Sequence, residues 1–548
     1  MKGQIMSYQL TTNAILEYGN SVFPHQSIIS HLPNKKRHEY SFSDLYKRSK
    51  KLSNALVNTF GVKPGDMIGT FAWNHYQHVE LYYGIPGAGA VCHTINIRLS
   101  EQQIEFIINN SEDKIIFVDA SLVKTIEKMA PLLVTVEHFV IINAPANFET
   151  TLPNTISYED ILDEVSDDFQ WVESEENDAC GMCYTSGTTG QPKGALYSHR
   201  STYLHALSVM SPNAGCYSVN DTILLIVPQF HVMAWGFPYM CLLAGAAMVL
   251  PSSNLQPDAI IHMLEREKIN KANGVPTIWL GVYEALKKNP PKEELTLEEY
   301  LVGGSALPQS LIEGFENDFG IKGVHAWGMT ETSPLGSVSR LQPKHKSLPA
   351  KEQLKIRAKQ GIEIPGIQLR VMQEDGNIAP RDGTAVGELE VKGAWVIDAY
   401  YKTTSREKFT DDGWFKTGDV STIDADGYME ITDRTKDLIK SGGEWISSVA
   451  IEKAIMGHSN ITEAAVIAIP DKKWVERPLA GVVLRNKDQK VTPEELIAFL
   501  EKDFAKYQIP EYYVFLDEIP KTSVGKFDKK EMRRLYAAGQ LKAVLVKN

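Results

Sequence analysis

Cysteine is scarce in this chain, which holds five among 548 residues: Cys92, Cys180, Cys183, Cys216 and Cys241. So few thiols in a chain of this length indicate a reducing compartment, and we expect a cytoplasmic protein. Basic residues are not in excess, because 56 of them face 68 acidic residues for a net charge of −12. That balance argues against nucleic acid as the main partner. Residues 1–19 hold no apolar segment preceded by basic residues, so we expect no secretory signal.

Long hydrophobic runs are also rare, and the one of membrane-spanning length is interrupted. Residues 232–250 are uncharged and mostly apolar, but Gly236, Pro238 and Gly245 fall inside them. Their positions predict a helix end that turns into a short buried strand. We therefore expect no transmembrane segment. Peripheral contact with a membrane stays open.

One pair of cysteines, Cys180 and Cys183, has the spacing C-x-x-C, but no second pair lies at metal-ligand spacing. On a strand, residues three apart point to opposite faces. We therefore expect both thiols to be buried packing residues.

The most informative stretch runs from Tyr184 to Gly194 and reads Y-T-S-G-T-T-G-Q-P-K-G. A small apolar segment at 179–184 opens it, so the loop should begin where a buried strand ends. Glycines let the backbone turn tightly and aim N–H groups inward, Ser and Thr hydroxyls add donors, and Lys193 adds a cation. This inventory suits a polyphosphate and holds no general base. The loop residues we expect at the phosphates are Thr185, Ser186, Gly187, Thr188, Thr189, Gly190 and Lys193.

A Walker-type phosphate loop is the nearest rival, because Lys193 lies six residues after Gly187 as that motif requires. However, Pro192 stands where the second glycine should be. Gly194 also replaces the Ser or Thr that would hold magnesium. The Walker motif is therefore excluded.

The length of 548 residues predicts two or more domains. Up to about residue 301, amphipathic windows alternate with short apolar runs, which predicts a layered α/β architecture with parallel strands. Ligands then gather at the carboxyl ends of those strands. After residue 343, short strand-like runs separated by Asp-Gly turns predict a small β-rich subdomain. The expected helices lie at 43–60 and 78–90, and the expected strands at 67–72, 114–118, 139–142 and 222–227.

A fresh α+β pattern begins after residue 437. We therefore place a large N-terminal domain at 1–432, a hinge linker at 433–438 and a small C-terminal domain at 439–548.

Polar and aromatic residues follow several of the predicted strands. His231 and Trp235 are four apart at the start of a predicted helix, where a lone histidine is often only structural. Gly303 and Gly304 follow another strand and would let a flat ring lie against bare backbone. Residues 326–332 (A-W-G-M-T-E-T) add an indole that can stack on such a ring and a carboxylate suited to magnesium.

Three more candidates lie towards the C-terminus. Asp419 ends the run D-G-W-F-K-T-G-D and could accept both hydroxyls of a ribose, with the Arg434 guanidinium nearby in sequence. Residues 436–445 join a charged linker to a glycine hairpin. Lys526 stands on a loop near the end of the chain.

In this order, the motifs resemble those of the acyl-adenylate-forming superfamily, which contains acyl-CoA synthetases, luciferases and the adenylation domains of peptide synthetases. The order holds across residues 40–530, nearly the whole chain. Three strings are most similar to bacterial medium- and long-chain fatty acyl-CoA synthetases: H-T-I-N-I-R-L at 93–99, F-H-V-M-A-W at 230–235 and D-R-T-K-D-L-I-K-S-G-G-E-W-I-S at 433–447.

Two positions depart from the family pattern. Trp327 stands where many relatives have tyrosine, so stacking on adenine is kept but a hydroxyl is lost. His325 stands where a side-chain amide often contacts adenine.

The resemblance implies a set of roles for named residues. The catalytic residues would be Thr185, Lys193, His231, Glu331 and Lys526. ATP and CoA would be bound by the phosphate-loop residues together with Gly303, Gly304, Ser305, His325, Trp327, Gly328, Thr330, Asp419, Arg434, Lys436, Ser441, Gly442, Gly443 and Glu444. Thr185 and Glu331 would hold Mg²⁺, and His231 with Trp235 would gate a fatty-acid tunnel.

The implied reaction activates a fatty acid with Mg-ATP to acyl-AMP and then transfers the acyl group to CoA. The resemblance also implies a mobile C-terminal domain that pivots at Lys436 between the two steps, and it allows a homodimer. Two alternatives stay open: an enzyme that loads a carrier-protein thiol instead of CoA, and a catalytically silent relative that only binds nucleotide or lipid.

Overall fold

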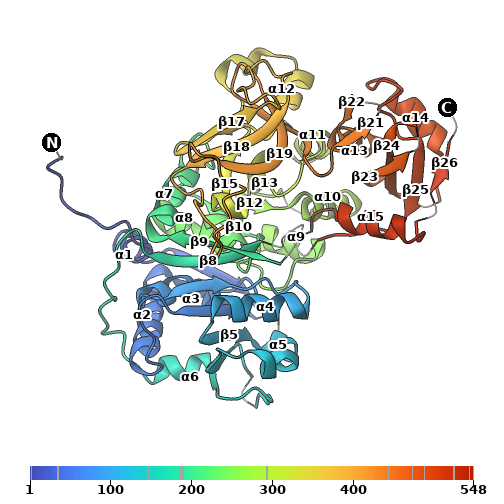
Figure 1. Ribbon diagram of the computed structural model, residues 1–548. Coiled ribbons are helices and arrows are strands. Elements are labelled where there is room, and N and C mark those ends of the chain that lie inside the picture. Colours follow the sequence, from blue (N-terminus) through green and yellow to red (C-terminus); the bar gives the residue numbers. More distant parts are fainter. Residues whose placement is uncertain are drawn as a thin grey trace.

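The computed structural model describes residues 1, 3–33, 36–145, 147–185, 191–291, 294–441, 444–471, 473–486, 488–522, 525–541 and 543–546. Within these residues the strands form four sheets. Figure 1 shows the N-terminal layers in blue and green, the next sheet in orange, and the C-terminal part in red to one side of the others. The layered α/β architecture expected from the sequence is therefore confirmed.

One sheet has the strand order β7-β6-β5-β3-β4-β8-β9, and its neighbours run parallel except for the antiparallel pair β8 and β9. Strands β3, β4 and β5 are buried along their whole length, because helices cover the sheet. The strands are β3 (Met67–Phe71), β4 (Val91–Thr94), β5 (Ile115–Asp119), β6 (His138–Ile142), β7 (Thr155–Ser157), β8 (Ala179–Thr185) and β9 (Lys193–Ser198). The accompanying helices are α2 (Phe42–Asn58), α3 (Tyr76–Gly87), α4 (Glu101–Ser111), α5 (Val123–Met129) and α6 (Tyr158–Asp163).

A second sheet has the order β16-β15-β14-β13-β12-β10-β11-β1-β2, with parallel pairing from β14 to β1. The strands are β1 (Ser27–His31), β2 (Arg37–Ser41), β10 (Thr222–Leu225), β11 (Ala247–Leu250), β12 (Lys271–Gly274), β13 (Glu299–Val302), β14 (Lys322–Gly328), β15 (Leu335–Val338) and β16 (Ile362–Glu363). The helices of this region are α1 (Thr12–Val22), α7 (His199–Met210), α8 (Phe237–Ala244), α9 (Pro257–Arg266), α10 (Pro276–Lys288), α11 (Gln309–Phe319) and α12 (Ala350–Arg357).

Two smaller sheets complete the described chain. The antiparallel sheet β17-β18-β19-β20 is the expected β-rich subdomain, and its strands are β17 (Ile367–Met372), β18 (Gly387–Gly393), β19 (Phe415–Ile423) and β20 (Met429–Arg434). The C-terminal sheet holds β21 (Ile439–Ser441), β22 (Glu444–Ile446), β23 (Ile461–Asp471), β24 (Val475–Leu484), β25 (Tyr512–Leu516) and β26 (Val544–Leu545). Helices α13 (Ser448–Met456), α14 (Pro493–Leu500) and α15 (Lys529–Ala537) belong to the same region.

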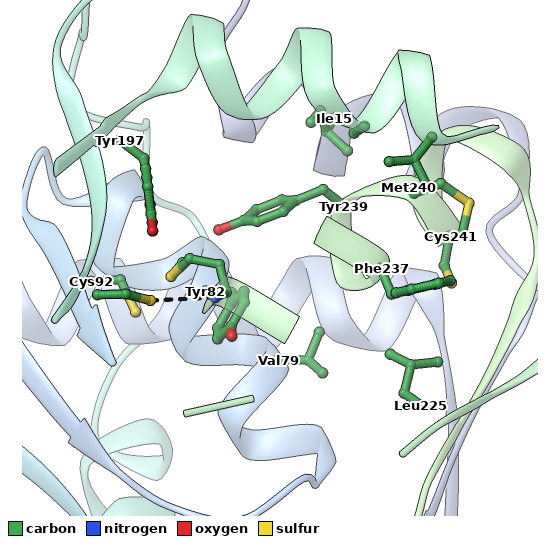
Figure 2. Packing of buried hydrophobic residues seen from close by; sticks show 14 of the residues in the cluster. Ile15, Val79, Tyr82, Cys92, Tyr197, Leu225, Phe237, Tyr239, Met240 and Cys241 are labelled. Carbon is green, nitrogen blue, oxygen red and sulfur yellow. Dashed lines mark hydrogen bonds between the residues drawn. The ribbon is translucent and has the colours of Figure 1, made fainter. Parts of the chain in front are cut away.

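A hydrophobic core between the two large sheets packs helices α1, α3 and α8 against strands of both sheets. Figure 2 shows side chains of α1, α3 and α8 converging there, among them Ile15, Tyr82 and Tyr239. The rings of Tyr82 and Tyr239 lie 5.7 Å apart. The Tyr82 hydroxyl also donates a hydrogen bond to the carbonyl of Gln229, two residues before His231. The core thus holds the segment that carries a candidate site residue.

The structure corrects one local expectation, the helix start at His231 and Trp235. Residues 232–235 all have positive φ between 39° and 54°, and Gly236 follows at 75°, so this segment is a left-handed turn and α8 begins only at Phe237. The Met233 N–H contacts the Sγ of Cys183 at 3.4 Å, and Met233 also packs against Gly181 on β8. These tertiary contacts override the local helical preference.

The remaining expected elements agree with the structure to within a few residues. The buried cysteines of β8, Cys180 and Cys183, are packing residues as expected. Gly245 ends α8 in a left-handed conformation and leads into the buried strand β11, also as expected. Among the described residues, no helix is long and apolar enough to cross a membrane.

Candidate active site

A cavity of about 970 Å³ lies at the carboxyl ends of the second sheet, where loops after β10, β12, β13 and β14 meet the C-terminal part of the chain. Most of the described residues that the sequence predicted line this one cavity. They are Thr185, Lys193, His231, Trp235, Gly303, Gly304, Ser305, His325, Trp327, Gly328, Thr330, Glu331, Asp419, Arg434, Lys436 and Lys526.

The ends of β8 and β9, on either side of the expected phosphate loop, supply part of the cavity lining. Thr185 ends β8 and Lys193 begins β9, and the two are direct cross-strand partners. The loop residues Ser186, Gly187, Thr188, Thr189 and Gly190 lie outside the described residues. The Lys193 ammonium sits 5.1 Å from the ring centre of Tyr400.

Glu331 lies in the short turn after β14 and is held by a residue that the sequence analysis missed. The Tyr400 hydroxyl donates to Glu331 Oε1 at 2.7 Å. On either side of Tyr400, the Ile397 N–H donates to the Glu331 carbonyl at 2.9 Å and the Tyr401 N–H donates to the Gly194 carbonyl at 2.8 Å. The segment 397–401 therefore connects Glu331 to strand β9, which begins at Lys193. Burial raises the pKa of Glu331, and the hydrogen bond from Tyr400 opposes that rise.

The donor set around Glu331 fits a magnesium ion that is shared with phosphates. The carboxylate is a hard oxygen ligand, 7% exposed, in the same cavity as the Thr185 hydroxyl. In the described part of the chain, no three His, Cys, Asp or Glu side chains are grouped to hold a metal by themselves. Mg²⁺ ordinarily completes its shell with substrate phosphates and water, so this sparse set is sufficient.

Asp419 and Arg434, which the sequence analysis expects at a ribose, lie together in the cavity lining. They are paired residues on β19 and β20, and Arg434 Nε lies 3.1 Å from Asp419 Oδ1. The indole Nε1–H of Trp327 donates to the other oxygen, Oδ2, at 2.9 Å. Asp419 is the largest cause of the raised pKa of Arg434, so this guanidinium stays charged.

Lys526 reaches into the cavity from the C-terminal part of the chain. A Cβ added to Gly304, which has a φ of 87°, would lie 3.3 Å from Lys526 Cε, so the lysine stem passes over bare backbone. Burial and the nearby Arg434 cation together lower the pKa of Lys526 to about 8, although Asp419 and Glu331 oppose the shift. Lys526 is thus a cation at neutral pH, but it loses its proton at a lower pH than an ordinary lysine does.

His231 and Trp235 mark the apolar side of the cavity. Burial lowers the pKa of His231 to about 3, with Lys526 and Arg98 adding to the effect, so the imidazole is neutral. The indole of Trp235 lies against Gly303, where an added Cβ would come 3.0 Å from the ring. The flat ring that lies against Gly303 in the structure is therefore the indole of Trp235. The apolar lining nearby comes from Val209, Phe237, Met329, Pro334 and Leu335.

The described part of the predicted glycine hairpin, residues 441–444, is not seen in the cavity lining. Of the site residues that the structure describes, Ser441 does not line the cavity but is buried in the C-terminal sheet, where its Oγ accepts a hydrogen bond from Arg477 Nη1 at 3.1 Å. Gly442 and Gly443 lie outside the described residues, as does the side chain of Glu444. His325 lines the cavity as a neutral side chain, because burial lowers its pKa to about 4 and its Nδ1 pairs with the Ala358 carbonyl at 2.9 Å.

Fold and site together define a nucleotide-binding enzyme of two unequal parts, with cations and carboxylates gathered where the parts meet. Comparison with known families agrees: residues 19–401 match the AMP-binding enzyme family and residues 450–526 match the AMP-binding enzyme C-terminal domain. The chain belongs to the AMP-binding enzyme family.

Relatives of known activity cover almost the full length. The chain is 42% identical over 537 residues to a long-chain-fatty-acid–CoA ligase of Thermus thermophilus, which covers 97% of this chain and 96% of that protein. It is 39% identical over 537 residues to a medium-chain-fatty-acid–CoA ligase of Ectopseudomonas oleovorans, covering 98% of each. It is also 40% identical over 535 residues to a 3-methylmercaptopropionyl-CoA ligase of Ruegeria lacuscaerulensis, covering 97% of this chain and 98% of that protein.

Solved structures show the same fold. An anthranilate CoA ligase in complex with anthranoyl-AMP superposes with a TM-score of 0.86 at 24% identity, covering 98% of this chain and all of that one. The ATP-bound MatB of Rhodopseudomonas palustris gives 0.81 at 24% identity, covering 97% of this chain and all of that one.

Proposed function

We propose that this protein joins a medium- to long-chain fatty acid to CoA at the expense of ATP, through an acyl-AMP intermediate, with release of AMP and pyrophosphate. The observation that carries the proposal is the convergence of Lys193, Glu331, Asp419, Arg434 and Lys526 on one cavity with an apolar side. The fatty acid ligases among its relatives support the substrate class.

In the first half-reaction a carboxylate oxygen attacks the α-phosphorus of ATP, and the bond to the β-phosphate breaks to release pyrophosphate. The acid is already ionised at pH 7, so no general base is needed. Lys526 would bridge the acid and the α-phosphate, Lys193 would face the β- and γ-phosphates, and Asp419 would hold the ribose. Magnesium on Glu331 and Thr185 would neutralise phosphate charge.

In the second half-reaction the CoA sulfur attacks the acyl carbon, the bond to AMP breaks, and the thiol proton passes to solvent. The structure has Lys526 in the cavity, which suits the first step. Contacts such as Arg485 to Glu284 at 2.7 Å hold the C-terminal part in that place. We propose that these contacts break when the domain pivots at Lys436 and brings the hairpin around Ser441 to the CoA entrance.

The division into residues 1–432, 433–438 and 439–548 is part of this proposal. The end of β20 at Arg434 and the start of β21 at Ile439 support it, because β20 belongs to the β-rich sheet and β21 to the C-terminal sheet. Strand β20 extends two residues into the proposed linker. A cytoplasmic location, peripheral membrane contact and a homodimer stay predictions.

The deciding experiment combines two measurements on the purified protein. ATP–pyrophosphate exchange stimulated by fatty acid tests adenylation, and its absence would leave only a silent nucleotide- or lipid-binding protein. Thioester formation with CoA and no carrier protein is then measured across saturated acids from C2 to C18 and with 3-methylthiopropanoate. Acyl-CoA from C8 to C18 acids supports the proposal. Exchange without acyl-CoA would instead indicate a carrier-protein acceptor.

A further inference from the structure

The side-chain geometry of Trp327 goes beyond a surface for adenine, and the inference drawn from it rests on the proposed use of ATP. Trp327 is 6% exposed and Asp419 is 2% exposed. A bond of 2.9 Å joins the indole Nε1–H to Asp419 Oδ2, although the two residues are 92 apart in sequence. The Cε3 and Cζ3 atoms of the indole lie close to Gly336, where an added Cβ would come within 2.6 Å of both, and the side chain lines the cavity. The six-membered ring and the Nε1–H of the indole therefore have separate neighbours.

One ion pair and one hydrogen bond reach the Asp419 carboxylate, and they fall on different oxygens. Arg434 approaches Oδ1 at 3.1 Å and Trp327 approaches Oδ2 at 2.9 Å. An ionised carboxylate oxygen has two lone-pair sites, so each oxygen keeps one site for a further donor. The Asp419 N–H is itself held by Thr417 Oγ1 at 3.0 Å. The carboxylate is thus held at both oxygens and its backbone is anchored separately, with the remaining acceptor sites available for a pair of hydroxyls.

Among the phenyl, phenol and indole rings, only the indole can supply this donor from the edge of the ring. A phenylalanine has no donor, and a tyrosine carries its hydroxyl at the far tip rather than at the edge. We propose that Trp327 is a positioning residue for ribose recognition: its N–H orients Asp419 so that the carboxylate meets both the 2′- and 3′-hydroxyls of ATP. This role is separate from any stacking of its ring on adenine.

Binding of ribose analogues separates the two roles of Trp327. Dissociation constants for ATP, 2′-deoxy-ATP and 3′-deoxy-ATP are measured by calorimetry with Mg²⁺ and without acid or CoA, in wild type and in Trp327→Phe. The matched control is Trp395→Phe, because Trp395 is also buried and its Nε1–H likewise donates a 2.9 Å bond, to the Leu335 carbonyl. A hydrogen bond to a charged group has a large effect on affinity, so we expect the wild-type preference for ATP over each deoxy analogue to fall about tenfold in Trp327→Phe. In Trp395→Phe the preference should stay unchanged.

The result that overturns the inference is a Trp327→Phe variant that loses affinity for ATP and both analogues by the same factor, because that is the signature of stacking alone. A wild type that does not distinguish ATP from the deoxy analogues overturns it as well, while the proposed function stands. A wild type that binds no ATP overturns both.

A second variant covers the case in which Trp327→Phe does not fold. Replacing Trp327 by benzothienylalanine substitutes sulfur for the N–H in a ring of nearly the same shape, so packing against Gly336 is kept. The ribose preference should fall in this protein too. An unchanged preference refutes the role of the N–H.

Discussion

The low pKa of Lys526 predicts a basic limit to the first half-reaction. The Lys526 ammonium is buried beside Arg434. Burial and this neighbouring cation together lower the pKa of Lys526 from the ordinary 10.5 to about 8 in the free enzyme. The lysine is charged below that pH and neutral above it. Because the cation is the form that stabilises charge in the transition state, kcat/KM for ATP–pyrophosphate exchange should be flat near pH 7 and fall above about pH 8.

The size of the fall follows from the titration. One pH unit above the pKa, roughly a tenth of the lysine is still charged, so kcat/KM at pH 9 should be about tenfold below its plateau. Thioester formation from supplied acyl-AMP should lack this fall, since the proposed domain movement removes Lys526 from the site.

Lys526→Arg provides the control, because a guanidinium stays charged throughout this range. The variant should be slower at pH 7 but should show no fall between pH 8 and 9. Rapid-quench measurement of each half-reaction across pH 6.5–9.5 gives both profiles. A fall near pH 8 that persists in Lys526→Arg would refute the assignment, and so would an equal fall in both half-reactions.

Three further predictions concern the metal carboxylate, its tyrosine and the apolar gate. Glu331→Gln should raise the Mg²⁺ concentration for half-maximal pyrophosphate exchange by about tenfold, with recovery at high Mg²⁺, because a neutral amide is a poorer ligand for a hard cation. Tyr400→Phe should raise the same concentration by about fivefold, the equivalent of the roughly 1 kcal/mol of one hydrogen bond. Trp235→Ala should let a long-chain acid bind without nucleotide, as calorimetric titration with and without a non-hydrolysable ATP analogue would show.

Each of these predictions has its own contrary result. If the Glu331→Gln variant matches wild type at every Mg²⁺ concentration, Glu331 is not a ligand of the metal. For Tyr400→Phe the matched control is Tyr401→Phe, and an equal shift in both variants would mean a general loss of packing. Truncating a buried tryptophan typically costs about 3–5 kcal/mol, so if Trp235→Ala only lowers the melting temperature, Trp235 is a packing residue.

Local patterns in the sequence were enough to predict elements whose ends are marked by their own residues. Helix α2 begins at a capping box between Ser41 and Asp44 and presents a regular apolar face, so its bounds were predicted to within two residues. Strand β8 also followed from local composition, whereas the pairing of Thr185 with Lys193 is seen only in the structure.

Features made by distant contacts could not be predicted in this way. Tyr400 lies 69 residues from Glu331, and no motif marks it, so only the fold reveals their hydrogen bond. The family resemblance predicted a stacking role for Trp327 but not its bond to Asp419, because the two residues are 92 apart in sequence and lie on strands of different sheets. The left-handed turn before α8 was wrongly predicted as helix because its cause is packing against β8.

The left-handed turn at residues 232–235 holds backbone strain. A residue other than glycine in the left-handed region is destabilised by roughly 1–2 kcal/mol, and residues 232–235 are four such residues in succession. Their sum, about 4–8 kcal/mol, is of the same order as the ~5.5 kcal/mol that reverses a two-state equilibrium from 1:99 to 99:1. A ligand that lifts Trp235 off Gly303 would release part of this strain as the turn unwinds. In the proposed gate, this release would offset part of the packing that is lost when the indole leaves Gly303, so the acid or nucleotide would need to supply less binding free energy to open it.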